Sequence, residues 1–281
     1  MRIRTLALAT VLALSIAAAR TLAGTPPKPA REMAVTFDDL PGVVAPGEGT
    51  AELRALTERL VRAIVSARIP AVGFLNEGKF APAGSRDPER VALLRRWVSA
   101  NLELGNHTYS HLDLHRVPLE QFEENVVRGE KVTKALLSPS NRRLRYFRHP
   151  YLHTGRSFQT RKSLEEFLTA RGYRVAPVTL DNSDWIFARA YAIAKQRGDR
   201  DVAQEVAAAY VPYMLAKTEY FERQSVRLFS REIRQILLVH AETGSGRFTG
   251  PDCLPRDGCR RRLGRVARII HGHPAETRGS A

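Results

Sequence analysis

Two aspartates and two histidines stand where they could hold a metal ion and activate water. Asp38 and Asp39 follow the short apolar run Met33–Phe37, and His107 and His111 are four residues apart. Residues four apart are neighbours on a helical turn, so we expect the two imidazoles to lie on one side of such a turn. Two imidazoles and one carboxylate leave a fourth position for water, as in catalytic metal sites. A divalent metal lowers the pKa of that water towards about 7 and polarises a carbonyl group.

A second carboxylate and a third histidine could complete the chemistry. One member of the Asp38-Asp39 pair could bind the metal while the other takes a proton from water, because consecutive side chains point different ways at a strand end. His240 ends another apolar run and could protonate a leaving group. Taken singly, these features are typical of turns, surface histidine pairs and salt bridges. Their combination predicts a metal-assisted hydrolase of an amide or an ester.

Strands and helices alternate along the chain, and the polar groups follow the strands. Apolar runs predict strands at Met33–Phe37, Ala71–Leu75, around Leu104, Leu144–Phe147, Tyr173–Leu180 and Ile236–Val239. Helical periodicity predicts helices at Ala51–Arg68, Pro88–Leu102, Leu119–Leu137, Ser157–Arg171 and Ile186–Phe229. This alternation predicts an α/β fold with a parallel sheet, open or closed into a barrel. The carboxyl ends of parallel strands meet at one edge, so groups far apart in sequence can converge there.

The composition is that of a globular protein, and its positive charge is not arranged for nucleic acid. The 281 residues are 43% hydrophobic, and the formal net charge is +15. Much of that charge lies in the two ends of the chain, and no stripe of basic residues interleaved with aromatics appears between them. We therefore expect no nucleic-acid partner. The two cysteines, Cys253 and Cys259, are too few for a disulfide scaffold, although they could pair in an oxidising compartment.

The N-terminus has the features of an export signal. Arg2 and Arg4 precede the apolar segment Leu6–Ala19, and small residues suited to cleavage follow it. The segment is shorter than the roughly 20 residues that span a bilayer. We therefore expect a signal peptide at residues 1–23, a leader at 24–30, and a periplasmic or secreted protein without a stable membrane span. An uncleaved membrane anchor is the alternative.

Five segments together resemble the polysaccharide deacetylases of carbohydrate esterase family four, the NodB-homology domain. They follow that family's motif order within residues 31–240: Thr36-Phe37-Asp38-Asp39, His107-Thr108-x-x-His111, Arg148-His149-Pro150-Tyr151, Asp181-x-x-Asp184-Trp185 and Leu238-Val239-His240. The resemblance implies a distorted (β/α) barrel of about seven strands. It also implies a hydrolase of carbon–nitrogen bonds other than peptide bonds, which removes N- or O-linked acetyl groups from a carbohydrate polymer.

The resemblance also implies a metal and a set of catalytic residues. One divalent ion would be bound, with zinc favoured and cobalt or manganese as alternatives. Its ligands would be Asp39, His107 and His111. Asp38 would be the base, oriented by Arg148, and His240 would be the acid, tuned by Asp184.

Three further residues would bind the substrate by the same resemblance. The backbone N–H of Tyr151 would help to hold the oxyanion, while Trp185 and Leu238 would wall the acetyl pocket. Neither the carbohydrate polymer nor the oligomeric state has a readable signature in this sequence.

The C-terminal part departs from the family pattern. After the fifth motif the family continues with a helix, a strand of the Gly-Tyr-x-Phe type and a closing helix, whereas residues 241–281 form an Arg/Gly-rich tail. We therefore expect a barrel that is incomplete at its C-terminal end. The alternative is a non-catalytic carbohydrate-binding relative impaired by this tail. The retained aspartates and histidines argue against that alternative.

Overall fold

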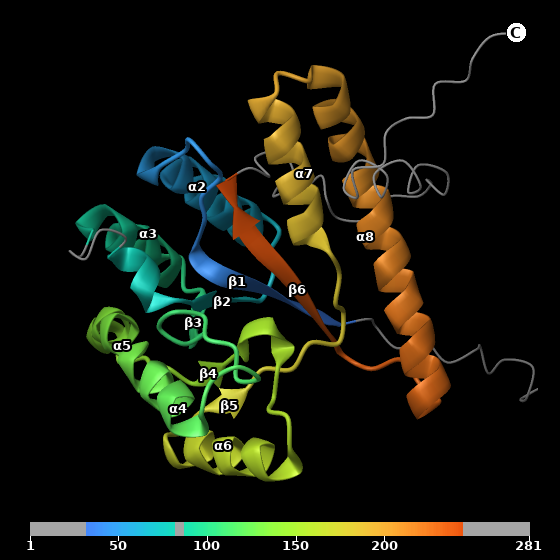
Figure 1. Cartoon of the computed structure of the whole chain (residues 1–281). Coiled ribbons are helices and arrows are strands. Elements are labelled where there is room, and N and C mark those ends of the chain that lie inside the picture. The colour runs from blue at the N-terminus through green and yellow to red at the C-terminus, as the bar shows by residue number, and fades with distance from the viewer. Residues whose placement is uncertain (1–31, 82–86, 244–281) are drawn as a thin grey trace, which may run out of the picture. The chain divides into compact units, whose positions relative to one another are not determined.

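Six parallel strands form the sheet that carries the polar motifs (Figure 1). The structure is a computed structural model that describes residues 32–81 and 87–243. The expected signal peptide, the leader, both cysteines and all but three residues of the tail lie outside these ranges. The strand order is β5-β4-β3-β2-β1-β6. The strands are β1 (Met33–Val43), β2 (Ala71–Leu75), β3 (Glu103–Asn106), β4 (Tyr146–Phe147), β5 (Arg174–Val175) and β6 (Gln235–Glu242).

Seven α-helices connect or follow these strands in the described residues. They are α2 (Thr50–Ser66), α3 (Pro88–Ser99), α4 (Leu119–Arg128), α5 (Lys131–Leu137), α6 (Phe158–Ala170), α7 (Asp184–Gln196) and α8 (Arg200–Phe229). Helix α3 begins at a cap, because the Asp87 carboxylate accepts hydrogen bonds from the backbone N–H groups of Glu89 and Arg90. The side chain of Ser157 caps α6 in the same way. Among the described residues, no helix is long and apolar enough to cross a membrane.

The sheet is curled, as shown by a short stretch of chain that joins its two edges. The N–H of Ala176 donates to the carbonyl of Phe147 on β4, and four residues later Leu180 bridges Leu237 on β6. Four residue steps reach at most about 14 Å. The outer strands of a flat six-stranded sheet would lie roughly 24 Å apart. The sheet is therefore a curled, incomplete barrel, and no strand ladder in the described residues joins β5 to β6.

The gap between β5 and β6 lies beside the last strand, at the C-terminal end of the barrel as expected. It arises in part from an earlier segment, the one between β4 and α7. The expected strand Tyr173–Leu180 is reduced to the two exposed residues of β5 and a single bridge at Leu180. Residues 32–81 and 87–243 therefore contain six strands and one isolated bridge, rather than about seven strands.

Two expected helices are each divided in the structure. The segment Leu119–Leu137 breaks at Gly129 and Glu130 into α4 and α5, and Ile186–Phe229 breaks at Gly198 into α7 and α8. Gly198 has φ +71°, a left-handed conformation that ends a helix and that glycine adopts without strain. Pro212, in contrast, lies inside α8 without ending it. Helical periodicity continued through both breaks, so periodicity alone could not place them.

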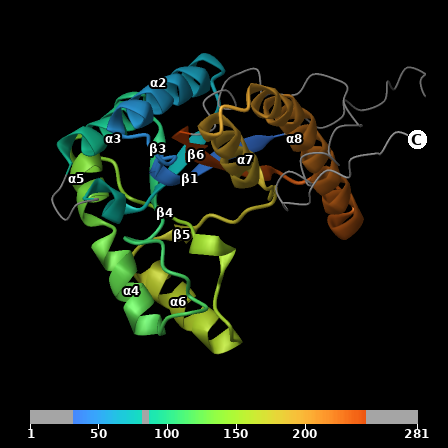
Figure 2. The same cartoon turned by 45° about the horizontal axis from the view of Figure 1, so that its top comes forward.

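The apolar residues form two separate clusters. The larger one lies between the sheet and helices α2 to α6. Its members include Leu75, Trp97, Leu104 and Phe147, which are all essentially inaccessible to solvent. The smaller one joins α7 to α8 around Phe187. Figure 2 shows these two helices side by side, as Figure 1 does. The main core thus lies under the strands that carry the polar motifs, while α7 and α8 form an added layer.

Candidate active site

Strand β1 carries both aspartates at an irregularity in the sheet. It is longer than expected and runs through Asp38 and Asp39 to Val43, while its pairing register shifts between Phe37 and Leu40 on one side. Asp39 has φ 69°, in the left-handed region. This local twist lets the neighbouring carboxylates face different partners, as the sequence predicted. The side chain of Asp38 is 4% exposed and that of Asp39 is 17% exposed.

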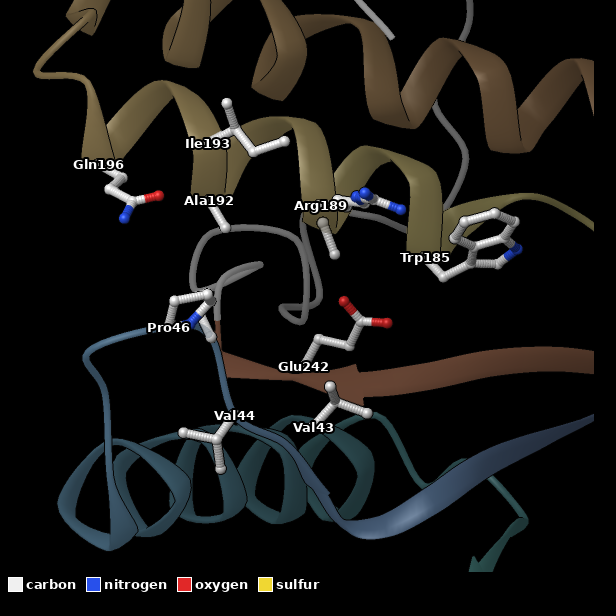
Figure 3. A pocket seen from close by; sticks show the side chains of 11 residues that line it. Val43, Val44, Pro46, Trp185, Arg189, Ala192, Ile193, Gln196 and Glu242 are labelled. Atoms are coloured by element: carbon white, nitrogen blue, oxygen red, sulfur yellow. The ribbon is translucent and has the colours of Figure 1, made fainter. Parts of the chain in front are cut away.

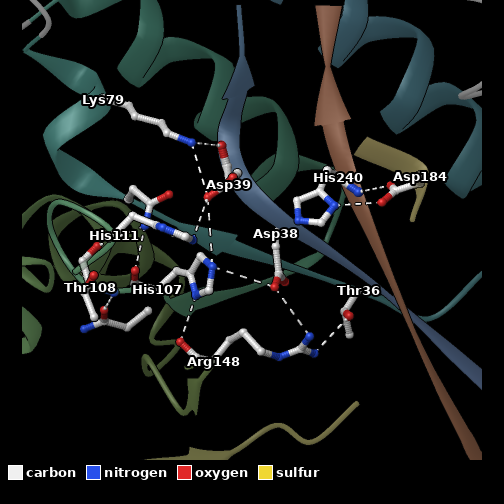
Figure 4. Close-up of polar contacts among 12 residues, drawn as sticks. Thr36, Asp38, Asp39, Lys79, His107, Thr108, His111, Arg148, Asp184 and His240 are labelled. Atoms are coloured by element: carbon white, nitrogen blue, oxygen red, sulfur yellow. Dashed lines mark hydrogen bonds and ion pairs between the residues drawn. The ribbon is translucent and has the colours of Figure 1, made fainter. Parts of the chain in front are cut away.

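Asp39, His107 and His111 converge on one point (Figure 4). Oδ1 of Asp39 lies 3.6 Å from Nε2 of His111 and 3.9 Å from Nε2 of His107. Nδ1 of His107 donates to the backbone carbonyl of Arg148 at 2.8 Å, which leaves the lone pair of Nε2 facing Asp39. Such a hydrogen bond from the other ring nitrogen is typical of histidines that bind metals.

The histidine pair does not lie on a helical turn, and that expectation was wrong. Residues 107–111 form an irregular loop directly after β3. Thr108 and His111 have φ values of 66° and 57°, so the chain folds back on itself and places the two rings 4.8 Å apart. The backbone reaches this geometry with support from Asn106, whose side chain accepts a hydrogen bond from the N–H of Thr108.

The three side chains fit a divalent metal ion. Bonds of about 2.0–2.1 Å at tetrahedral angles place ligand atoms roughly 3.3 Å apart, a few tenths of an ångström closer than the separations here. Oδ1 of Asp39 is buried and has no hydrogen-bond partner, and although it forms an ion pair with Lys79 at 3.3 Å, it also faces both histidines and can bind a metal ion. Burial lowers the pKa of His107 to about 3, so its imidazole is neutral and able to bind a metal. Burial raises the pKa of Asp39, but the cationic Lys79 and the histidines outweigh it and lower that pKa to about 2.

Asp38 is held by Arg148 and keeps one oxygen free of hydrogen bonds. Nη1 of Arg148 lies 3.5 Å from Oδ2 of Asp38, and Nη2 donates to Oγ1 of Thr36 at 3.0 Å. Arg148 is buried under Phe74, with its guanidinium 4.7 Å from the ring centroid. Burial raises the pKa of Asp38 to about 7, although the nearby guanidinium lowers it. Oδ1 of Asp38 has no partner, so it can accept a proton.

His240 lies next to Asp38 and is tied to Asp184. The register of β1 and β6 pairs Asp38 with His240. Nδ1 of His240 donates to Oδ1 of Asp184 at 2.8 Å, and its backbone N–H donates to Oδ2 at 2.6 Å. Burial alone lowers the pKa of His240, but the Asp184 carboxylate outweighs it and raises that pKa to about 9. Nδ1 is thus occupied, and Nε2 is the nitrogen that can reach a substrate.

His240 does not end its strand, contrary to expectation. β6 continues through Ala241 to Glu242, and Ala241 is buried. Thr243 then accepts a hydrogen bond from the N–H of Ala45. The segment that the sequence assigned to a tail therefore begins with residues of the sheet, and His240 has strand residues on both sides of it along β6.

Lys79 is a site residue that the sequence analysis missed. It lies in a short 3₁₀ helix, η1 (Glu77–Phe80), directly after β2. Its ammonium group donates to the backbone carbonyl of Asp39 at 3.0 Å and lies 3.3 Å from Oδ1. Burial lowers the pKa of Lys79, and Asp39 opposes this change. The sequence held a clue to Lys79. Polar residues follow each of the other strands that build the site, and Lys79 follows Ala71–Leu75 in the same way.

The three expected substrate residues are placed differently from one another. Tyr151 is 59% exposed, has φ 57°, and its ring centroid lies 4.6 Å from that of His111. Trp185 borders a cavity of about 410 Å³ between β1, β6 and α7, whose polar lining includes Arg189 and Glu242 (Figure 3). Leu238 is buried and does not line this cavity. Tyr151 thus lies beside His111, whereas the cavity that Trp185 borders is lined by none of the Asp39, His107 and His111 ligand set.

Residues 25–167 match the model of a protein family described as "Polysaccharide deacetylase". This match covers just over half of the chain and includes the first three of the five motifs. The fourth and fifth motifs, with Asp184 and His240, lie beyond the matched residues. The pairing of β1 with β6 and the hydrogen bond from His240 to Asp184 place them at the site.

The solved structures to which this chain is similar include hydrolases and a pseudoenzyme. A family 4 carbohydrate esterase from Streptomyces lividans, in complex with acetate, is 18% identical with a TM-score of 0.47, over 86% of this chain and 88% of the other. A peptidoglycan deacetylase from Bacillus subtilis is 16% identical with a TM-score of 0.47, over 87% and 85%. A CE4 family pseudoenzyme from Bacillus anthracis is 16% identical with a TM-score of 0.44, over 80% and 60%. The chain thus spans about three fifths of the pseudoenzyme's length.

Proposed function

The chain belongs to the polysaccharide deacetylase family, and from this premise we propose that it is a metal-dependent hydrolase that removes acetyl groups from a carbohydrate polymer. The observation that carries the proposal is the position of two titratable groups beside the convergent ligand set. Asp38 and His240 are partners in the register of β1 and β6, and Asp38 also lies 3.7 Å from His107. A base and an acid therefore flank the point where Asp39, His107 and His111 meet.

The metal would be held by Asp39, His107 and His111, with zinc favoured by two imidazoles and one carboxylate. When bound, such an ion polarises the acetyl carbonyl and makes water more acidic. Every other part of the reaction falls to side chains and backbone groups of this chain.

Asp38 takes the proton of the attacking water. Its pKa of about 7 lets the carboxylate accept a proton near neutral pH, and Oδ1, which has no hydrogen-bond partner while Arg148 holds Oδ2, is the oxygen that takes it. The water oxygen then bonds to the acetyl carbon, and the backbone N–H of Tyr151 stabilises the developing oxyanion.

His240 completes the reaction by protonating the leaving group. Its raised pKa keeps the imidazole charged at neutral pH, so Nε2 carries a proton to donate. When the bond from the acetyl carbon to nitrogen or oxygen breaks, that proton goes to the leaving amine or hydroxyl, and acetate is released. Asp184 keeps Nδ1 occupied and holds the ring in place.

Two assays on one purified sample test the proposal. We expect one zinc ion at the Asp39 site and release of acetate from at least one of four substrates: peptidoglycan, chitin oligomers, poly-N-acetylglucosamine and acetylxylan. Asp38→Asn should abolish acetate release and leave metal binding intact, because Asp38 is not a ligand in this mechanism. Asp181→Asn is the matched control, since Asp181 is exposed and the same change there should alter neither quantity. Loss of the metal in Asp38→Asn would make Asp38 a ligand and contradict the mechanism.

We also propose that the mature chain acts outside the cytoplasm, in the periplasm or the medium. The support is the Arg-flanked apolar segment within residues 1–23. Processing at this segment in cells, read by the N-terminal sequence of the exported protein, tests the proposal.

A further inference from the structure

A second group of metal-ligating side chains lies next to the site and has no part in the proposed reaction. It consists of Asp113, His115 and His153, which can each offer one ligand atom within 4.8 Å of the others. Apart from the Asp39 group, it is the only such set among residues 32–81 and 87–243. Asp113 and His115 lie between the His111 loop and α4, and His153 directly follows the short 3₁₀ helix η3 (Pro150–Leu152).

One carboxylate and one imidazole of this group already share a proton. Nδ1 of His153 donates to Oδ1 of Asp113 at 2.7 Å. The backbone N–H of His115 donates to the same oxygen at 2.8 Å, and Arg116 lies 3.4 Å from the other oxygen, Oδ2. The carboxylate is therefore fixed in position. A cation that replaced the shared proton would need these ligand atoms to separate by only about half an ångström, to roughly 3.3 Å.

The hydrogen bond between His153 and Asp113 does not explain the position of the second imidazole, His115. The rings of His115 and His153 are stacked, with centroids 3.9 Å apart and planes 8° from parallel. Nε2 of His115 is buried and has no hydrogen-bond partner. Buried polar atoms of this kind are costly unless something binds them or the group has a use. A tilt of the half-exposed His153 ring would bring both imidazoles and the carboxylate onto one ion.

We propose that Asp113, His115 and His153 form a second divalent-cation site, distinct from the Asp39 site, for an ion of the zinc class. Two imidazoles and one carboxylate are a donor set that suits Zn²⁺ and Co²⁺. The side chain of His153 is 39% exposed, whereas that of His107 is 2% exposed. The second ion should therefore exchange with solvent more readily than the first.

A cation at this position would tie two loops of the site together. The ring of His153 lies 5.8 Å from that of Tyr151, which in turn lies 4.6 Å from that of His111. Tyr151 and Leu152 are both left-handed, with φ 57°, a conformation that costs about 1–3 kcal/mol per residue and persists only when its surroundings hold it. An ion on His153 and Asp113 would anchor this turn to the loop that follows His111. The binding itself does not depend on the proposed hydrolysis.

Counting the metal ions bound to the chain without its signal peptide, from residue 24 to residue 281, tests the second site. The tail has its own thiols and imidazoles, so every protein in the experiment carries Cys253→Ser, Cys259→Ser, His271→Ala and His273→Ala. After incubation with ZnSO₄ and gel filtration, elemental analysis and native mass spectrometry should find two zinc ions in this reference protein. His115→Gln and His153→Gln should each bind one ion.

A variant of the first site separates the two proposals. Asp39→Asn should retain one zinc ion through the second site, and the double variant Asp39→Asn/His153→Gln should retain none. A retained ion in Asp39→Asn supports the second site even if the enzyme proves inactive.

The reference protein and Asp39→Asn also decide the question if a variant of the second site fails to fold. Titration of the reference protein with Co²⁺ should show two successive steps in visible absorption, and a folded His153→Gln variant should lose the weaker step. A single bound ion in the reference protein that is lost in Asp39→Asn would overturn the proposal. Two ions that persist after substitution of His115 and His153 would overturn it as well.

Discussion

Replacing Asp184 by asparagine tests how the structure sets the charge of His240. Asp184 is 6% exposed and accepts two hydrogen bonds from His240, one from the ring and one from the backbone. Asparagine keeps the size of the side chain but removes its negative charge. The pKa of His240 is lowered by burial, but Asp184 and, less strongly, Asp39 and Asp38 raise it to about 9, so it should fall towards the ordinary value of 6.5 once Asp184 loses its charge.

The shift is large enough to dominate the rate above neutral pH. At pH 8 the protonated fraction of His240 should fall from about 0.9 to about 0.03, so acetate release should drop roughly 30-fold. Near pH 6 most of that loss should disappear, because His240 would be largely protonated in both proteins. The alkaline limit of the pH–rate profile should therefore move down by about 2.5 pH units.

The same shift predicts how stability depends on pH. A group whose pKa is raised on folding stabilises the protein fully below its unfolded pKa, and that contribution is lost as the pH rises through the folded pKa. Relative to Asp184→Asn, the native chain should gain on the order of 3 kcal/mol below pH 6, and this difference should vanish above about pH 9. Urea denaturation at several pH values measures it.

Carbon-13 NMR of the labelled His240 ring reads the pKa directly, whether or not the variant is active. Asp181→Asn is the matched control, because Asp181 is three residues away and exposed. If the ring titrates near pH 9 in Asp184→Asn, or if the control moves it equally, the assignment of Asp184 as the residue that raises the pKa is refuted.

Two further changes probe the surroundings of the site. Lys79→Met removes a positive charge 3.3 Å from Oδ1 of Asp39 and should tighten Zn²⁺ binding severalfold, because the bound ion would no longer face a second cation. Isothermal titration measures this, and weaker binding would mean that Lys79 serves mainly to position the carboxylate. Gly105→Ala would place a Cβ atom 2.4 Å from the buried ring of Phe74. It should therefore destabilise the protein by about 1–3 kcal/mol, and an unchanged melting temperature would contradict this packing argument.

The sequence by itself determined which residues gather at the site. Alternating strands and helices predict a parallel sheet, and polar residues at strand ends of such a sheet must share one edge. This rule correctly placed Asp38, Asp39, His107, Arg148 and His240 together, because it depends only on local periodicity and on the direction of the strands. Applied to the end of β2 as well, it would have included the lysine that lies beside Asp39.

Other properties were decided by the tertiary structure. Asp38 and Asp39 are consecutive and chemically identical, yet their pKa values are raised to about 7 and lowered to about 2. Burial dominates for Asp38, whereas Lys79 and three histidines outweigh burial for Asp39. The left-handed backbone that brings the histidine rings together also depends on distant support, since Asn76 donates to the carbonyl of His107 from the neighbouring strand end. Such effects come from residues that meet only once the chain has folded, so no local pattern in the sequence contains them.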